Sequence, residues 1–349
     1  MKIFTIDPSC DSRWARFLDR HPRASAFHTP GWLEALHRTY GYEPVVYTTS
    51  PPEQELTNGV AFCRVDSWLT GRRLVSLPFS DHCEPLVDNP QELAFLLSNL
   101  QANQRVNNWK YLEVRPVSGI LHDPSTGDGF SPCRRYYLHT ICLRPDLNEI
   151  FRRLHKDSIQ RRIHKAERLG LRYECGRSDA ILEKYYRLSL LTRQRHRVPP
   201  QPLEWYRNLC RCMGDAINIH VASQGDRPVA SIITLRFKDT VFYKYGSSDS
   251  TYKKLGATPF LLWRAIEAAR AAGAQALDLG RSDLDNEGLI TFKEKWASAR
   301  TSLVYWRYPS PDGTSLDSSR AVNIVRRAFA LMPKQLQTIT GRFLYRHLG

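Results

Sequence analysis

The sequence predicts an α+β protein built from two tandem lobes, each a mixed, largely antiparallel sheet flanked by helices. The chain has 349 residues. A single hydrophobic core stops growing at about 250–300 residues, so two domains are expected. Strand-forming and helical runs follow one another in a definite order in the second half, and the same order recurs more loosely in the first half. We therefore expect an internal duplication, with lobes at 1–145 and 146–310.

The elements of the first lobe follow from apolar periodicity and from turn residues. Helices are predicted at 12–20, 30–40 and 91–104, and strands at 44–49, 59–65, 73–78, 110–115 and 136–143. Pro30 and Gly31 suit the start of the second helix. The third helix carries a leucine stripe that predicts one buried face.

The second lobe gives the clearer pattern. Helical stretches are predicted at 147–169, which is basic, and at 178–194 and 202–213. Three strand-forming runs joined by short polar connections, which suit hairpins, occupy 219–223, 228–237 and 240–248. A helix at 258–272, a strand at 276–280, a helix at 288–296 and a strand at 302–308 complete the order.

Charge and cysteine usage limit the classes of partner and of site. The formal net charge is +15 and the pI is about 9.6. Such a balance favours anionic partners such as nucleic acid, phosphorylated lipid, a nucleotide-linked sugar or coenzyme A, although a solvated basic surface explains it as well. The eight cysteines have no zinc spacing, so we expect no metal and reduced thiols. We see no export signal and no long apolar run, which predicts a cytoplasmic protein.

The C-terminal segment 311–349 is predicted to be a basic amphipathic helical tail. From Arg320 onward it has six Lys and Arg residues and no acidic residue, with apolar residues between them. Such a helix lies on an anionic membrane surface or packs on the lobes. In the first case the protein is peripheral on the inner face of the membrane.

Three antiparallel strands, helix, strand, helix, strand is the element order of the GNAT acyltransferase core, a fold-level analogy. Several runs resemble the FemAB-like family, also described as BioF2-like acetyltransferase domains: YKYGSSDS (243–250), LGATPFLLWRAIEAARAAG (255–273) and ALDLGRSDLDNEGLITFKEKW (276–296). The runs RRIHKAERLGL (161–171) and GRRLVSLPFSDHCEPLV (71–87) are similar to the family's basic helix and to the first-lobe motif of envelope and exopolysaccharide-associated members.

This resemblance implies an N-acyltransferase with no permanently bound cofactor. Its co-substrate would be acyl-CoA or aminoacyl-tRNA. Its acceptor would be an amine of an anionic cell-envelope, peptidoglycan or exopolysaccharide precursor, and this precursor can be linked to a lipid. Two features differ from the peptidoglycan-bridge members. Arg115 in LEVRP stands where those carry an aspartate before a proline, and no helical-hairpin arm is evident. The alternative is a non-catalytic, basic RNA-binding or membrane-docked accessory protein that retains the duplicated fold.

Three residues are candidates for catalysis. The resemblance places Lys293 of the FK motif at the active centre, where its ammonium would stabilise the oxyanion that forms on the carbonyl oxygen. Asp278, at the end of a strand, would orient Lys293 or a neighbouring arginine. Tyr245, near the end of the third strand of the meander, would act as a general acid. The simpler alternatives are a solvated lysine, a salt bridge in a turn and ordinary aromatic packing.

The candidates for binding are mostly polar residues at strand ends and in loops. Arg281 would clamp a phosphate or carboxylate. The other predicted substrate contacts are Ser247, Ser248, Arg115 and His82. KKLGAT (253–258) stands where acetyl-CoA enzymes carry a glycine-rich loop before a helix N-terminus, so Lys254 and Gly256 are predicted to bind the pyrophosphate of the donor. This motif is degenerate, because Thr258 replaces the last small residue.

Overall fold

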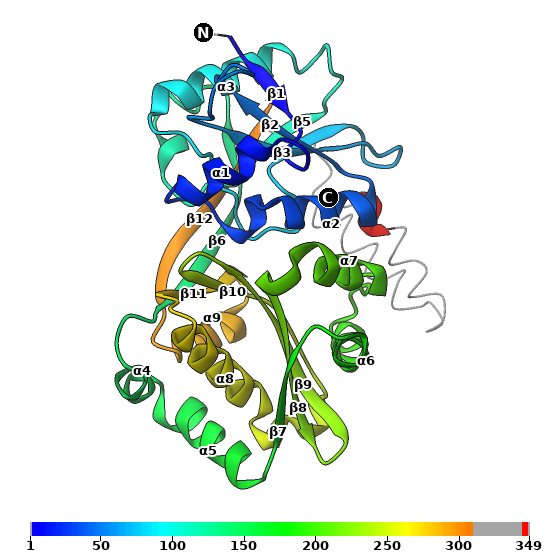
Figure 1. Ribbon diagram of the computed structural model, residues 1–349, viewed down its shortest axis with the longest axis vertical. Helices are drawn as coiled ribbons and strands as arrows, with labels where there is room; N and C mark the ends of the chain where they lie inside the picture. The colour runs from blue at the N-terminus through cyan, green and yellow to red at the C-terminus, as the bar shows by residue number, and fades with distance from the viewer. Residues whose placement is uncertain (1, 310–343, 348–349) are drawn as a thin grey trace. The chain divides into compact units, whose positions relative to one another are not determined.

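The computed structural model describes residues 2–309 and 344–347, which separate into two compact units (Figure 1). The first unit holds 2–135, 303–309 and 344–347, and the second holds 136–302. The predicted C-terminal tail lies outside the described residues, except for 344–347. Each unit contains strands with its own helices.

The first unit has a mixed sheet with the strand order β1-β2-β3-β4-β5-β12. Its strands are β1 (Phe4–Ile6), β2 (Glu43–Thr48), β3 (Val60–Val65), β4 (Arg73–Val75), β5 (Tyr111–Val114) and the end of β12 (Ala299–Tyr308). Neighbours are antiparallel except β4 and β5, which are parallel. Its helices are α1 (Ser12–Arg20), α2 (Pro30–Tyr40) and α3 (Pro90–Ala102), with single turns at Ala26–His28 and Ile120–His122.

The helices of the first unit begin where the sequence supplies caps. The side chain of Asn89 accepts a hydrogen bond from the backbone of Glu92 and Pro90 follows it, a common helix start. The leucine stripe of α3 then packs on the sheet, against Phe62 and Leu112 among others. Burial of this stripe fixes the helix on the sheet, as the sequence predicts.

The second unit has the strand order β6-β11-β10-β9-β8-β7. Its strands are β6 (Ser131–Cys142), β7 (Arg172–Gly176), β8 (Ile217–Gln224), β9 (Arg227–Phe237), β10 (Thr240–Ser248) and β11 (Ala276–Asp283). Its helices are α4 (Leu147–Arg153), α5 (Arg161–Arg168), α6 (Asp179–His196), α7 (Leu203–Met213), α8 (Ala257–Ala271) and α9 (Glu287–Glu294). Shorter turns of helix occupy Lys156–Gln160, Gly214–Ala216 and Ser250–Leu255.

Helices cover both faces of this second sheet (Figure 1). The apolar side chains of α4, α5 and α8, together with Trp296 just after α9, form one buried core on one face. Helices α6 and α7 lie on the opposite face (Figure 1). The two faces therefore present different environments to residues that alternate along β10 and β11.

Strands β10 and β11 pair over a short stretch only. They are parallel from Thr240 and Ala276 to Phe242 and Asp278. Beyond it, β10 has an irregularity between Tyr243 and Tyr245, and β11 has one opposite β6 between Asp278 and Arg281. Such irregularities bend a strand and redirect its side chains, often next to functional sites. Here the pairing of β10 with β11 ends at Phe242 and Asp278, and the sheet opens between the two strands beyond this point.

Three local expectations need correction. The predicted helix at 147–169 is broken after Arg153, because Leu154 is extended and the side chain of His155 caps the following turn. The predicted strand at 73–78 ends at Val75, since Leu77 and Phe79 have positive φ angles of 44° and 62°. Strand β1 was not predicted, and its three residues carry too short a pattern to signal a strand.

Candidate functional site

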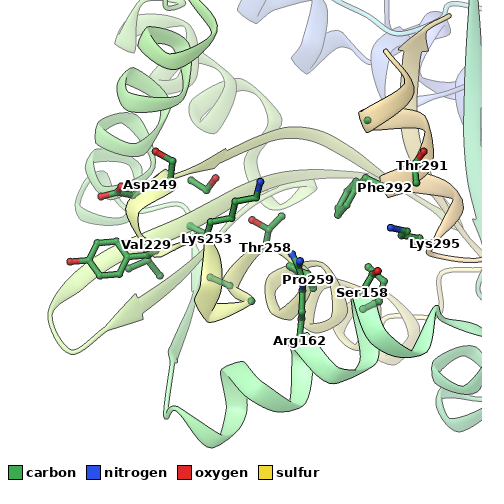
Figure 2. A pocket seen from close by; sticks show the side chains of 18 of the residues that line it. Ser158, Arg162, Val229, Asp249, Lys253, Thr258, Pro259, Thr291, Phe292 and Lys295 are labelled. Carbon is green, nitrogen blue, oxygen red and sulfur yellow. The ribbon is translucent and has the colours of Figure 1, made fainter. Parts of the chain in front are cut away.

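A cavity of about 890 Å³ lies within the second unit (Figure 2). Its walls come from α5 and the turn before it, the Ser250–Leu255 turn, the first turn of α8, and α9. The cavity therefore surrounds the start of α8 and lies between α5 and α9.

The start of α8 gives this cavity an anion-binding wall. Gly256 is the N-cap, and no side chain caps the helix. The first N–H groups of a helix have no partner within it and carry partial positive charge, so they attract phosphates and carboxylates. Gly256, Ala257 and Thr258 all line the cavity. Their backbone is the kind of cradle that the sequence predicts here.

Gly256 also allows α5 to approach this helix start. Its φ angle is +78°, and a Cβ atom at this position would lie 2.4 Å from the backbone oxygen of Arg162. Any larger residue must therefore push α5 away from α8 and accept an unfavourable backbone conformation. The close approach of Arg162 is a structural reason for glycine at this position, and the predicted role of Gly256 in donor binding stays a prediction.

Basic side chains predominate around the cavity. Arg162, Arg195, Lys253 and Lys295 line it, and Figure 2 labels three of them. Among the described residues, no ion pair or side-chain hydrogen bond engages Arg162, Lys253 or Lys295. The acidic lining residues are Asp249 and Glu287, and Asp249 forms an ion pair with Arg227 at 3.3 Å. The cavity thus has an excess of positive charge.

The lysine of the KKL run that lines the cavity is Lys253, and the predicted Lys254 does not. The run forms a 3₁₀ helix, Ser250–Leu255, in which residues three apart share one side. Ser250, Lys253 and Gly256 therefore face the cavity together. The sequence does not reveal this three-residue period, and the predicted role of Lys254 in donor binding stays a prediction.

Helix α9 has two different sides. Gly288, Thr291, Phe292 and Lys295 line the cavity, as their spacing along one face of a helix requires. Lys293 points the other way and is only 3% exposed. Its Nζ atom donates hydrogen bonds to the backbone oxygens of Gly280 and Arg281, both over 2.8 Å. Lys293 is thus buried beneath α9 and is not a solvated helix lysine.

Asp278 and Arg281 belong to the same irregular part of β11. The Oδ1 atom of Asp278 accepts a hydrogen bond from the backbone N–H of Gly280 over 2.6 Å, and Gly280 has a φ angle of +72°. The guanidinium of Arg281 lies 4.4 Å from the ring centre of Tyr136, a cation–π contact. Asp278 therefore holds the β11 bulge through a backbone N–H group, and Lys293 holds it through two backbone C=O groups.

Tyr245 does not join this group. Its hydroxyl accepts a hydrogen bond from Nε1 of Trp205 over 2.9 Å, and its ring packs on Tyr206, so it faces α7. Burial raises the pKa of Tyr245 well above its usual value, which disfavours loss of the proton. Lys293 instead approaches the sheet on the face that α8 covers, where the neighbouring Phe292 packs in the same core. The structure thus separates two of the three predicted catalytic residues.

The two predicted serines lie on different sides of β10. Ser248 lines the cavity, and its backbone is held by Thr192 and Arg195 of α6, with N–H to Oγ1 at 2.9 Å and Nη1 to O at 3.2 Å. Ser247 is buried and does not line the cavity. The alternation of side chains along a strand explains this difference.

His82 and Arg115 lie in the first unit and are built into its interior. The Arg115 guanidinium donates to Glu113 and to the backbone oxygen of Leu77, and it stacks on Tyr305. Burial acts to raise the pKa of Glu113, but Arg115 and Arg307 lower it to about 2. His82 is buried edge-on against Phe27. These contacts hold both side chains within the first unit. Their predicted role in substrate binding stays a prediction.

His139 and Ser282 were missed by the sequence predictions. They are 0% and 1% exposed, and neither ring nitrogen of His139 nor Oγ of Ser282 has a hydrogen-bond partner among the described residues. Burial and the nearby Lys293 charge lower the pKa of His139. Buried polar atoms are nearly always hydrogen-bonded, so such a pair is unusual. The pairing of β6 with β11 places both residues near the bulge, and no local pattern in the sequence indicates this.

Part of the second unit is similar to a known protein family. Residues 153–293, less than half of the chain, match the family model of the acetyltransferase (GNAT) domain. No curated protein matches the sequence.

Solved structures resemble the whole fold at low identity. The crystal structure of FemX is similar at 12% identity with a TM-score of 0.69, covering 93% of this chain and 100% of that one. The tandem GNAT protein from the clavulanic acid biosynthesis pathway has 11% identity and a TM-score of 0.55, covering 89% of this chain and 100% of that one. L-PGS from Bacillus licheniformis has 14% identity and a TM-score of 0.54, covering 93% and 98%.

These comparisons confirm the predicted fold class of two tandem GNAT-like lobes and the predicted resemblance to FemAB-like proteins. At these identities the solved structures establish the fold alone.

Proposed function

We propose that this protein is an acyltransferase that binds the phosphates of its acyl donor in the cavity at the start of α8, within the residues 153–293 that match the GNAT acetyltransferase model. The observation that carries this proposal is the uncapped helix N-terminus surrounded by the side chains of Arg162, Lys253 and Lys295. Helix amides and unpaired cations together favour a polyanionic group over a neutral one.

Acyl-CoA is the donor that this cavity fits best. Its pyrophosphate and ribose phosphate carry the negative charge that the wall would neutralise, and the cavity volume of about 890 Å³ is in the range of ligand pockets. Aminoacyl-tRNA presents phosphates as well, so the same wall would hold its acceptor end. The experiment below separates the two donors.

The chemistry proposed is attack of an amine nitrogen on the donor carbonyl carbon. The C–N bond forms, the bond to the leaving sulfur or oxygen breaks, and the nitrogen loses a proton. We place this step at the β11 bulge, where the sheet is open. There Lys293, which is buried on the side of α9 turned from the cavity, would stabilise the oxyanion once its ammonium turns from the Gly280 and Arg281 oxygens. The buried imidazole of His139 would accept the proton.

The acceptor we propose is an amine on an anionic cell-envelope, peptidoglycan or exopolysaccharide precursor. FemX and L-PGS share the fold, and the motif resemblance points to envelope-associated members of the family. The basic character of the chain would favour such an acceptor by long-range attraction.

Donor binding is tested by thermal unfolding with and without acetyl-CoA. A ligand at 100 times its Kd adds about 2.7 kcal/mol to the stability of the folded state, which raises the unfolding midpoint. We expect this rise in the wild type and its loss in Arg162→Glu and Lys253→Glu. The matched controls are Arg161→Glu and Lys254→Glu, because these neighbouring residues are exposed and do not line the cavity.

Two other results would change the conclusion. If only aminoacyl-tRNA binds, and the same two variants abolish that binding while their controls do not, the donor is aminoacyl-tRNA and the site stands. If neither donor binds, or if the cavity variants behave like their controls, the proposed donor site is wrong. Binding of charged tRNA without transfer would support the alternative of an accessory RNA-binding protein.

A further inference from the structure

Two loops of the first unit lie side by side at one edge of its sheet. Strands β4 and β5 are parallel neighbours, so the loops that lead into them, 66–72 and 103–110, lie at the same end of the two strands. The backbone N–H of Lys110 donates to the oxygen of Arg72 over 2.7 Å, which ties the two loops together. We refer to residues 66–72 and 103–110 as the loop pair.

The loop pair presents large apolar side chains to solvent. Trp68 is 77% exposed, Leu69 is 55% exposed and Val106 is 83% exposed. These three are among the seven exposed large hydrophobic residues of the described chain, and the other four lie elsewhere. Scattered single residues of this kind need no explanation, whereas three on two hydrogen-bonded loops form a candidate interaction site.

Hydrogen bonds hold these side chains outward. Oγ of Ser67 accepts from the backbone N–H of Thr70 over 2.9 Å, and the backbone N–H of Gly71 donates to the oxygen of Ser67 over 2.7 Å. Gly71 has a φ angle of +87°, which closes the turn. In the second loop, Trp109 is buried and anchors the chain beside Val106. The exposed residues thus stand on formed turns.

Basic residues surround the apolar ones. Arg72, Arg105 and Lys110 are exposed on the loop pair, and Arg346 is exposed next to His347, whose ring contacts Trp68 at 5.5 Å. The acidic residue of the pair, Asp66, forms an ion pair with Arg72 at 3.2 Å. The surface is therefore apolar at its tips and positive around them.

We propose that the loop pair docks the first unit on an anionic lipid surface. Tryptophan favours the boundary between water and hydrocarbon, leucine and valine insert below it, and arginine and lysine contact lipid phosphates. Exposed apolar side chains flanked by cations on the same two loops suit a deformable, negatively charged layer. Among residues 2–309 and 344–347, no helix has the length and apolar content to cross a bilayer.

Sedimentation of the full chain with vesicles tests the proposal. The probes are phosphatidylcholine vesicles and vesicles in which about one third of the lipid is phosphatidylglycerol. We expect binding to the anionic vesicles alone, weakened roughly thirtyfold by Arg105→Glu, because the reversal changes the charge by two units of about 1 kcal/mol each near such a surface. The double variant Trp68→Ser, Leu69→Ser should weaken it similarly. Leu169→Ser and Leu284→Ser, each 46% exposed elsewhere, are the controls and should bind normally.

Tryptophan fluorescence gives an independent measurement. Of the eight tryptophans, Trp68 alone is exposed, and the other seven are buried. Protection from an aqueous quencher on adding anionic vesicles would therefore report insertion of Trp68. The proposal is overturned if the full chain does not bind anionic vesicles. It is also overturned if the loop variants bind like the controls and deletion of residues 320–343 alone abolishes binding, which would assign the contact to the C-terminal tail.

Discussion

Lys293 of α9 holds Gly280 of β11 through a hydrogen bond of 2.8 Å from Nζ to the backbone oxygen. The residue that the sequence motif singles out is thus also a support for the opening in the sheet. A role in the reaction and a role in the fold must therefore be measured separately.

Lys293→Met is expected to lower kcat about 100- to 1,000-fold, because loss of one oxyanion donor has an effect of this size. It should also lower the unfolding midpoint, since two buried carbonyl oxygens lose a donor. The rates are measured well below that midpoint. Lys295→Met is the control, and it should raise KM for the donor while kcat changes little. Full activity in Lys293→Met would remove this residue from the mechanism.

His139→Leu is expected to leave stability unchanged or raise it while lowering kcat. The ring nitrogens of His139 are buried without partners among the described residues, so an apolar side chain of similar size removes an unfavourable burial. A purely structural histidine would show the opposite, a less stable protein with normal activity. Thermal unfolding and steady-state kinetics on the same sample distinguish the two, and Ser282→Ala extends the test to its neighbour.

Gly256→Ala is expected to weaken donor binding at least tenfold. The added Cβ would meet the Arg162 oxygen at 2.4 Å and move α5 from the cavity wall. Gly170→Ala and Gly273→Ala are matched controls, because both glycines have positive φ angles and nothing lies within 4 Å of an added Cβ. All three variants carry the same backbone strain, so only a difference in acetyl-CoA affinity reports the contact. Equal affinities would show that the spacing of α5 and α8 is unimportant.

Stability should fall as the pH drops from about 6.5 to about 4. Burial lowers the pKa of His28 and of His220 to about 4, against an ordinary value of 6.5. The unfolded chain therefore binds more protons than the folded chain in this window, and the free energy of unfolding is at its full value only above about 6.5. Each histidine contributes on the order of 3 kcal/mol to this change. His28→Gln should flatten the dependence on pH, whereas exposed His164→Gln should not; identical profiles would contradict the prediction.

The sequence by itself predicted most of the helices and strands in their order along the chain. It missed β1 and β7, and it assigned the strands at 136–143 and 302–308 to the other lobe in each case. Apolar periods of two and of 3.6 residues, and caps such as Asn89 with Pro90, are local, so most helices and strands lie within a few residues of their predicted positions. The helix start at Gly256 was identified for the same reason, because a positive φ angle and a free helix N-terminus leave a signature in adjacent residues.

Only the tertiary structure decided which side chains meet. Lys253 in place of Lys254 faces the cavity because the turn before α8 winds with three residues per turn, which composition does not reveal. Tyr245 and Lys293 approach the sheet from opposite faces, and His139 lies beside Lys293, because bulges in β10 and β11 set the register. Strand pairing over long sequence separations fixes such relationships, and one residue of register moves a side chain to the other face. No local pattern carries that information.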